Sequence, residues 1–371
     1  MSQSLDMNLQ DPWVIENIVN VNNRALCFSR KIDLSGMFWL DEENLALDFD
    51  SYYPRKDTSF MRFSQLIYNE GKVYCIPRKG NTLDIYNIEN KTWDSIEIKE
   101  PSQDLIKYPY SEDAKFSFSV IKDGKLFLFP ETYPCIVCVN LETNTLIYLY
   151  DKMPNLIRIK SNNLLAFSTK GIIKKDNVIF YSRVEAALMS FDTRTHNISV
   201  VYKLNDSENQ NRIMENDGDN IWLFPQNENG KIINYDSEGI ISTYDYHVEG
   251  FKYWRISFYL SILIDNKIWL LPGMADESLC FDIDSKKMEK NKFFKSSFLR
   301  KEEKKEQYKY IQLERIGKNI FAFDGSTCQL ECVNLDTNLL RRKKVLITND
   351  SCTRMEIKYL MDSINVYKRE A

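Results

Sequence analysis

Six basic residues recur at matching places along this 371-residue chain, each at the start of a short apolar run. They are Arg62, Lys115, Arg212, Arg255, Lys309 and Arg354. Cations gathered around one point would attract a carboxylate, a phosphate, or an acidic peptide or sugar, and arginine would add bidentate contacts. In the alternative interpretation, these side chains pair with acidic neighbours or cover apolar surface with their stems. The sequence leaves both interpretations open.

Two aromatic residues, Tyr253 and Trp254, directly precede Arg255. An aromatic ring next to a cation suits stacking on a sugar or on another ligand with an apolar face. Core packing is the alternative for both rings. We include Tyr253 and Trp254 with the six basic residues as the predicted ligand-binding set.

Standard catalytic and metal-binding motifs do not occur in the sequence. Only two histidines are present, and there is no phosphate-binding glycine loop, Gly-x-Ser-x-Gly elbow or His-Glu zinc motif. Cys135 and Cys138 form one close pair, and Cys328 and Cys332 another. Residues three apart on a strand face opposite sides, so we expect buried free thiols, no metal and no cofactor.

Composition limits the classes of partner and the cellular location that we expect. The net charge is −4 with acids and bases mixed along the chain, which argues against nucleic acid. No apolar run is long enough to span a bilayer, and the start lacks the pattern of a signal peptide. Eight scattered cysteines suggest reduced thiols, and therefore a cytoplasmic protein without membrane contact. The richness in Lys, Asn, Ile and Tyr is typical of AT-rich bacterial genomes.

Six copies of a β pattern position these residues, and they recur every 43 to 53 residues. Each copy has a short apolar run directly after a turn. The runs are "KVYCIP" from Lys72, "KLFLFP" from Lys125, "NVIFYS" from Asn177, "NIWLFP" from Asn220, "KIWLLP" from Lys267 and "NIFAFD" from Asn319. Such runs, rich in β-branched and aromatic residues and bounded by turn formers, predict strands.

A second apolar run follows in each copy and ends in Asp or Asn, whose side chain is suited to cap the next turn. Proline ends the first run in four copies, and it stops strand pairing because it has no N–H. With a strand before the turn and one after the second run, each copy has four strands. We name them the inner, second, third and outer strands. Four antiparallel strands per repeat of this length predict a β-propeller blade.

The stretch "YNIENKTW", Tyr86 to Trp93, resembles the third strand and turn of kelch repeats. The resemblance covers about residues 60 to 345. The chain departs from it in two ways: Pro, Ser or Asp replaces the Gly-Gly pair that normally closes the second kelch strand, and one copy alone keeps the Trp. The resemblance implies a kelch-like propeller.

Seven blades are expected, with six or eight as alternatives. For the seventh we predict a composite blade, with an inner hairpin from the C-terminus (354–368) and outer strands from the N-terminus (36–50), so that both ends close the ring. Residues 17–30 also look like an inner hairpin, which leaves open an eighth partial blade. The prediction is one propeller domain over 1–371, with a flexible tail at 1–12 and a charged inter-blade insertion at 286–308.

Two functions follow from this fold class. The first is a non-enzymatic binding module whose axial face, with or without an anion-binding role, meets a partner protein, peptide or anionic glycan. The second is a carbohydrate-active hydrolase, lyase or epimerase acting on an anionic sugar, which is an analogy at the level of fold. The sequence identifies no catalytic set, although Glu356 and Tyr310 are candidates for a general acid or base at the axial face. We favour the binding module.

Overall fold

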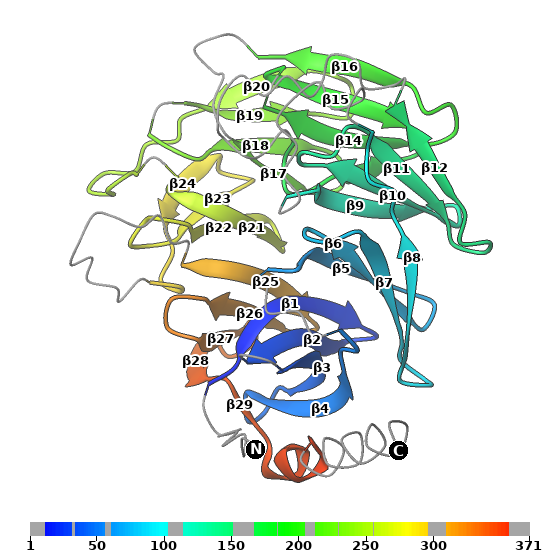
Figure 1. Cartoon of the computed structure of the whole chain (residues 1–371). Coiled ribbons are helices and arrows are strands. Elements are labelled where there is room, and N and C mark those ends of the chain that lie inside the picture. Colours follow the sequence, from blue (N-terminus) through cyan, green and yellow to red (C-terminus); the bar gives the residue numbers. More distant parts are fainter. Residues whose placement is uncertain are drawn as a thin grey trace, which may run out of the picture. The chain divides into compact units, whose positions relative to one another are not determined.

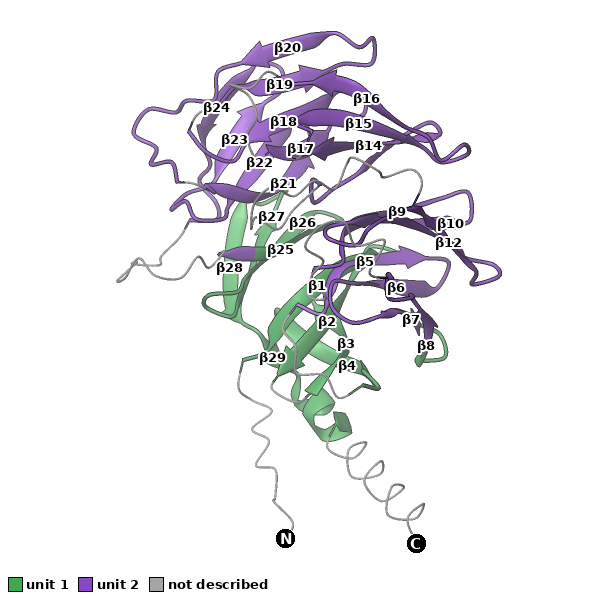
Figure 2. Cartoon of the chain, turned by 45° about the horizontal axis from the view of Figure 1, so that its top comes forward, with its two compact units in different colours: residues 1–60, 87–93, 311–371 green, residues 61–86, 94–310 purple. Residues whose placement is uncertain are grey.

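The computed structural model describes residues 12–31, 34–55, 61–102, 114–150, 167–183, 185–204, 212–228, 230–254, 256–295 and 309–355. The chain is all-β, and its described strands form seven sheets (Figure 1). The fold is a seven-bladed β-propeller of four-stranded antiparallel blades, as the repeat pattern predicts. Figure 2 divides the chain into two compact units, residues 1–60, 87–93 and 311–371 in unit 1, and residues 61–86 and 94–310 in unit 2.

Each blade is a meander in which strands pair in chain order. The first sheet holds β1 (Val14–Val21), β2 (Arg24–Lys31), β3 (Leu34–Asp41), β4 (Ala46–Tyr52) and, parallel to β4, β29 (Leu346–Ile347). The next two hold β5 (Phe63–Asn69), β6 (Lys72–Pro77), β7 (Thr82–Asn87) and β8 (Thr92–Glu97), then β9 (Phe116–Lys122), β10 (Lys125–Pro130), β11 (Ile136–Asn140) and β12 (Leu146–Leu149).

The remaining blades follow the same plan. Two of them hold β13 (Ile172–Lys174), β14 (Asn177–Ser182), β15 (Ala187–Asp192) and β16 (Ile198–Lys203), then β17 (Arg212–Asn216), β18 (Ile221–Pro225), β19 (Ile232–Tyr235) and β20 (Ile241–Tyr244). The last two hold β21 (Phe258–Ile264), β22 (Lys267–Pro272), β23 (Leu279–Asp282) and β24 (Lys287–Lys290), then β25 (Tyr310–Ile316), β26 (Asn319–Asp324), β27 (Gln329–Asn334) and β28 (Leu339–Lys344).

Short turns fix the register of the inner hairpins. Glu70 and Gly71 both have positive φ, 48° and 78°, and Asp123 and Gly124 repeat this with 48° and 69°. Two residues with positive φ make the type I′ turn whose twist matches that of the strands, and glycine takes the second position without strain. The hairpins β5–β6 and β9–β10 therefore begin where the turn residues predict.

The expected ends of the strands are also confirmed. Pro77, Pro130, Pro225 and Pro272 are the last residues of β6, β10, β18 and β22. The Asn140 Oδ1 accepts the N–H groups of residues 142 and 143 at 2.9 and 3.0 Å, so this side chain caps the turn after its strand.

The core lies between neighbouring blades. The second strands are buried along their length, as in β10 and β18, whereas outer strands such as β8 are largely exposed. Trp222 on β18 is fully buried, and its indole N–H donates to Asp217 Oδ2 at 2.8 Å. Trp269 on β22 is 8% exposed and stacks on Phe293. Both tryptophans pack as core residues, as expected.

Strands from both ends of the chain close the ring in the first blade, as predicted, but the predicted division of strands between the two ends is wrong. Residues 14–52 supply all four strands of the meander, and the predicted hairpin at 17–30 is its inner pair, β1 and β2. Up to residue 355, the C-terminal segment adds one strand, β29, at the β4 edge, and the Trp13 N–H donates to the Val345 carbonyl at 2.8 Å. Residues 349–355 are helical instead of forming an inner strand; residues 356–371 lie outside the described residues.

The predicted insertion at 286–308 begins inside a blade, because residues 287–290 form the outer strand β24. Residues 296–308 of that segment, and residues 1–11 of the predicted tail, lie outside the described residues.

One buried serine anchors the C-terminal helical turn to β4. The Ser351 hydroxyl accepts the Phe49 N–H at 2.7 Å and donates to Asp48 Oδ1 at 2.6 Å. Ser351 is fully buried, so a missing hydroxyl would leave the Phe49 amide without a partner.

We predict that Ser351→Ala lowers the free energy of unfolding by about 1–3 kcal/mol, because a buried amide loses its acceptor. Urea denaturation followed by fluorescence measures this. Thr353→Ala, an exposed residue on the same helical turn, is the matched control and should change the free energy of unfolding by less than about 0.5 kcal/mol. Equal effects of the two substitutions would contradict the anchor.

Candidate functional site

Antiparallel pairing brings the start of each inner strand and the end of each second strand to the same edge of a blade. We call this the entry edge. In unit 2 the Arg78 N–H, just after β6, donates to the Arg62 carbonyl at 2.9 Å, and the Glu131 N–H, just after β10, donates to the Lys115 carbonyl at 2.7 Å. Predicted basic residues therefore lie at the entry edge beside residues that follow the second strands.

The charged groups of the first two predicted basic residues contact other side chains of the protein. Arg62 is 6% exposed, and its guanidinium lies 3.7 Å from Asp84 Oδ2. Lys115 is 1% exposed, forms an ion pair with Glu100 at 2.9 Å, and donates to Asn81 Oδ1. These contacts hold neighbouring segments of unit 2 together; a direct role in ligand binding stays a prediction.

Arg212 and Lys309 are placed in a similar way. The Arg212 guanidinium donates to the Lys231 carbonyl at 2.7 Å, and the Lys309 ammonium donates to the Lys295 carbonyl at 2.5 Å. Arg212 is 1% exposed. The Lys309 ammonium also lies 4.7 Å from the centre of the Tyr310 ring, which is fully buried. The second acid/base candidate, Glu356, lies outside the described residues.

The aromatic residues near Arg255 are half-buried, while Arg255 itself lies outside the described residues. The Tyr253 hydroxyl donates to the Tyr246 carbonyl at 2.7 Å and accepts the Val248 N–H at 3.1 Å. Burial raises the pKa of Tyr253 to about 12. The Trp254 ring carries the Lys252 ammonium 4.5 Å from its centre. Tyr253 therefore ties a loop of unit 2 together, and Trp254 makes a cation–π contact within the same loop.

Arg354 does not begin an inner strand, so that part of the prediction is wrong. It lies on the helical turn of unit 1, where its guanidinium binds Asp350 at 3.1 Å and also contacts Asp48. The residues around Arg354 in the sequence resemble those at the start of the inner strands in the other copies. In the first blade, however, β1 and β2 already form the inner pair of strands.

A second row of polar residues at the entry edge was missed in the sequence. It comprises the residues that directly follow the second strands in four successive copies: Arg78, Glu131, Arg183 and Gln226. All four lie in unit 2. The sequence does contain a sign of this row, because each of the four residues directly follows the Pro or Ser that ends a second strand.

Arg78 and Glu131 face each other without a hydrogen bond. Arg78 Nε lies 3.8 Å from Glu131 Oε2, and Arg78 Nη1 lies 3.4 Å from the sulfur of Met61. The Arg78 side chain is 25% exposed and that of Glu131 is 3% exposed. Glu131 Oε1 is buried and has no hydrogen-bond partner among the described residues. Arg78 is thus the accessible member of the pair, with Glu131 buried beside it.

The other half of the row is joined by a direct contact. Arg183 Nη2 donates to Gln226 Oε1 at 3.3 Å. Gln226 is 3% exposed. Its backbone carbonyl accepts the Ser257 N–H at 2.6 Å, just before β21 begins. A buried amide therefore positions the second arginine of the row.

The charge of Glu131 depends on its surroundings. Burial raises the pKa of Glu131 to about 7, and the guanidinium groups of Arg78 and then Arg183 oppose that rise by favouring the carboxylate. A carboxyl group that exchanges its proton near neutral pH can accept or donate a hydrogen bond. The row therefore combines two fixed cations with one titratable acid.

A further polar network in unit 2 joins Lys170, which lies just before β13, to the inner strands β17 and β21. The Lys170 ammonium donates to Glu215 Oε2 at 2.8 Å and to the Ser261 carbonyl at 2.7 Å. The Ser261 hydroxyl donates to the same Glu215 oxygen at 2.9 Å. These groups satisfy one another, so the network links inner strands and leaves its acid neutralised.

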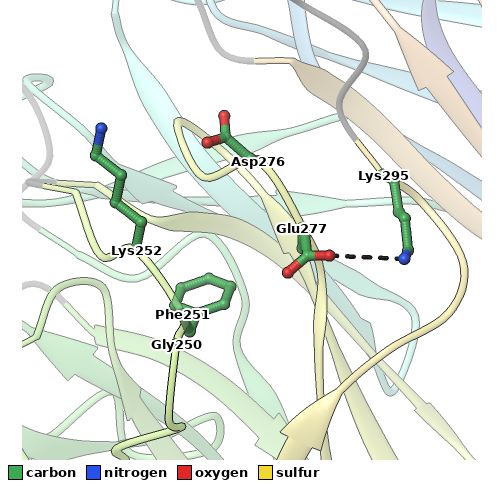
Figure 3. A pocket seen from close by; sticks show the side chains of 6 residues that line it. All are labelled: Gly250, Phe251, Lys252, Asp276, Glu277 and Lys295. Atoms are coloured by element: carbon green, nitrogen blue, oxygen red, sulfur yellow. Dashed lines mark ion pairs between the residues drawn. The ribbon is translucent and has the colours of Figure 1, made fainter.

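One open pocket of about 370 Å³ lies beside the blade β21–β24, and its lining combines basic, acidic and aromatic groups. Its lining residues are Gly250, Phe251, Lys252, Asp276, Glu277 and Lys295. Figure 3 shows Lys295 turned toward Glu277, at 3.6 Å, while Lys252 and Asp276 point away from that pair. Lys290 also binds Glu277, at 3.1 Å. Two lysines thus already neutralise Glu277, one of the two carboxylates that line the pocket.

Neither a metal cluster nor a membrane-spanning helix is found among the described residues. Of the four cysteines considered for zinc, Cys135, Cys138 and Cys332 are buried and Cys328 is half-buried. Burial raises the pKa of the Cys138 and Cys332 thiols. These thiols therefore stay protonated at neutral pH, which disfavours metal binding.

No protein-family model matches the sequence, and no curated protein matches it. Solved structures match the fold. A streptogramin B lyase superposes with a TM-score of 0.59 at 11% identity over 91% of this chain and 95% of the other. A catalytically inactive virginiamycin B lyase from Staphylococcus aureus gives 0.58 at 10%, over 86% and 93%. BamB from Moraxella catarrhalis gives 0.54 at 10%, over 90% and 88%. At these identities the similarity shows the propeller fold alone.

We predict that Glu131 makes stability fall as pH rises. Its folded-state pKa of about 7 exceeds the ordinary value of 4.5, so the folded protein binds more protons than the unfolded chain between those values. The free energy of unfolding therefore decreases from pH 4.5 to 7, by up to about 3 kcal/mol, and Glu131→Gln removes that decrease. Urea denaturation across this range tests it, with Glu142→Gln on an exposed turn as control. Parallel pH profiles for wild type and Glu131→Gln would contradict the assignment.

Proposed function

We propose that this chain is a non-enzymatic binding module. Its entry edge in unit 2 would hold an anionic group of a partner protein, peptide or glycan. The observation that carries the proposal is Arg78, an arginine at 25% exposure whose described contacts are a 3.8 Å ion pair and a thioether. Arginine prefers short bidentate bonds to carboxylate or phosphate, so this guanidinium has donors to offer.

Two features around Arg78 support the same function. Arg183 adds a second cation on the same edge, and Gln226 holds it in place at 3.3 Å. Four successive blades contribute to the row, so its geometry rests on the rigid ends of strands rather than on long loops. The assignment to a kelch-like subfamily remains part of this proposal, and it rests on the turn pattern at residues 86–93.

A second candidate function is favoured by one observation, the pKa of Glu131 near 7. A carboxyl group that titrates near neutral pH beside an arginine suits general acid or base catalysis. This would make the protein a carbohydrate-active enzyme acting on an anionic sugar. Mass spectrometry of any bound glycan after incubation distinguishes the two: turnover by the wild type that Glu131→Gln abolishes would favour the enzyme.

We predict that an array of glycans and acidic peptides contains a ligand for the wild type, and that Arg78→Gln with Arg183→Gln weakens its binding about ten-fold or more. The reason is that each lost charge-assisted hydrogen bond is worth about 1.5–3 kcal/mol. Biolayer interferometry measures the dissociation constants.

The control removes the same charge elsewhere on unit 2. Arg194 and Lys175 are exposed and lie on turns at the opposite edge of their blade, so Arg194→Gln with Lys175→Gln should leave binding within about two-fold. Equal losses in the two double variants would mean that net charge, rather than the entry edge, governs binding.

A further inference from the structure

Arg78 and Glu131 do not form a close, hydrogen-bonded salt bridge. An arginine and a carboxylate that satisfy each other approach to about 2.7–2.9 Å, often through two parallel bonds. Here the nearest nitrogen and oxygen are 3.8 Å apart, and Glu131 Oε1 has no hydrogen-bond partner among the described residues. Buried polar atoms nearly always have partners, so an orphan oxygen next to an under-used guanidinium calls for an explanation.

The two groups offer different bonding capacity. Arg78 has only donors, and it suits an anionic oxygen. Glu131 exchanges its proton near neutral pH, so it can accept from a hydroxyl as carboxylate and donate to one as acid. A ligand that satisfies both must therefore carry an anionic oxygen and a hydroxyl close together.

We propose that Arg78 and Glu131 together bind a hydroxylated carboxylate, such as a sugar acid, with the carboxylate on Arg78 and a neighbouring hydroxyl on Glu131. This deepens the proposed function and rests on it, because it names the ligand class of the same edge. Arg183 and Gln226 would then contact the remainder of the ligand.

A simple inorganic anion fits the pair less well. Any anionic oxygen on Arg78 lies close to the Glu131 carboxylate and is repelled by it, and sulfate has no hydroxyl group that could donate a compensating hydrogen bond to that carboxylate. A hydroxyl group carries no such penalty and gains a charge-assisted hydrogen bond. The acid of the pair therefore selects a ligand with a hydroxyl beside its charge.

Glu131 Oε1 is buried, so a ligand reaches it only after a side chain moves, and we take Arg78, the more exposed member of the pair, to be the one that turns aside. That motion breaks only a long ion pair and a contact to sulfur. Both are weak compared with the two hydrogen bonds that the ligand would make.

The test compares three probes by NMR titration of the full-length protein: galacturonate, galactose and inorganic sulfate. Galactose keeps the hydroxyls and lacks the carboxylate, whereas sulfate keeps the charge and lacks a carbon-bound hydroxyl. We expect galacturonate to bind at least about ten-fold more tightly than either, which corresponds to one additional charge-assisted hydrogen bond.

The variants separate the two contacts. Arg78→Gln should lower the affinity for galacturonate to that for galactose. Glu131→Leu should lower it to that for sulfate, and Glu131→Gln, which keeps hydrogen-bonding capacity but loses the charge, should retain galacturonate and bind sulfate more tightly. Glu142→Gln is the matched control for the acid, and circular dichroism verifies that each variant is folded.

Two results would overturn this inference while leaving the proposed function in place. One is equal affinity for galacturonate and sulfate with loss of both in Arg78→Gln, which describes a general anion site. The other is no binding of any probe while the array ligand still depends on Arg78. If neither the probes nor the array ligand depends on Arg78, both proposals fail.

Discussion

The second strands of the blades bury side chains on both of their faces, and this constraint governs the rest of the structure. Strands β10 and β18 are buried along almost their whole length, so each sheet must be covered on both sides by apolar neighbours. A single four-stranded sheet cannot satisfy that requirement, whereas repetition of sheets can. The outer strands show the opposite pattern: β28 is almost entirely exposed and carries a run of Arg and Lys. Charge at that edge also discourages pairing with other chains.

This constraint explains why most of the fold could be predicted from the sequence. Turn residues such as Asp123 and Gly124 have the local conformation that their types favour, and the strand-ending prolines stop pairing where they stand. The last blade could not be predicted as well. The alternation of apolar and polar residues from Arg354 favours a strand, but residues 354 and 355 belong to the helical turn, and β1 and β2 already form the inner pair of the first blade.

The candidate site was harder to predict for a related reason. In a repeat sequence, the positions at which the copies carry the same type of residue are the most conspicuous, and the recurring basic residues are of this kind. Their agreement reflects in part contacts within the protein, such as Arg62 with Asp84 and Lys115 with Glu100, whose partners lie 15 to 22 residues away. Glu131 and Arg78 differ from each other at one repeat position, so they looked like variation. Their significance comes from a 3.8 Å separation that only the three-dimensional structure gives.

The pairing of β29 with β4 has a consequence for synthesis on the ribosome. The first blade can form its own meander early, because residues 14–52 contain all four strands. Its outer edge stays open until residues 346–355 emerge from the ribosome, long after β4, because β29 and the Ser351 hydroxyl cover that edge. During elongation the nascent chain thus presents an unpaired strand edge that could join another nascent chain. A segment synthesised long after the first blade therefore protects that blade from association with other chains.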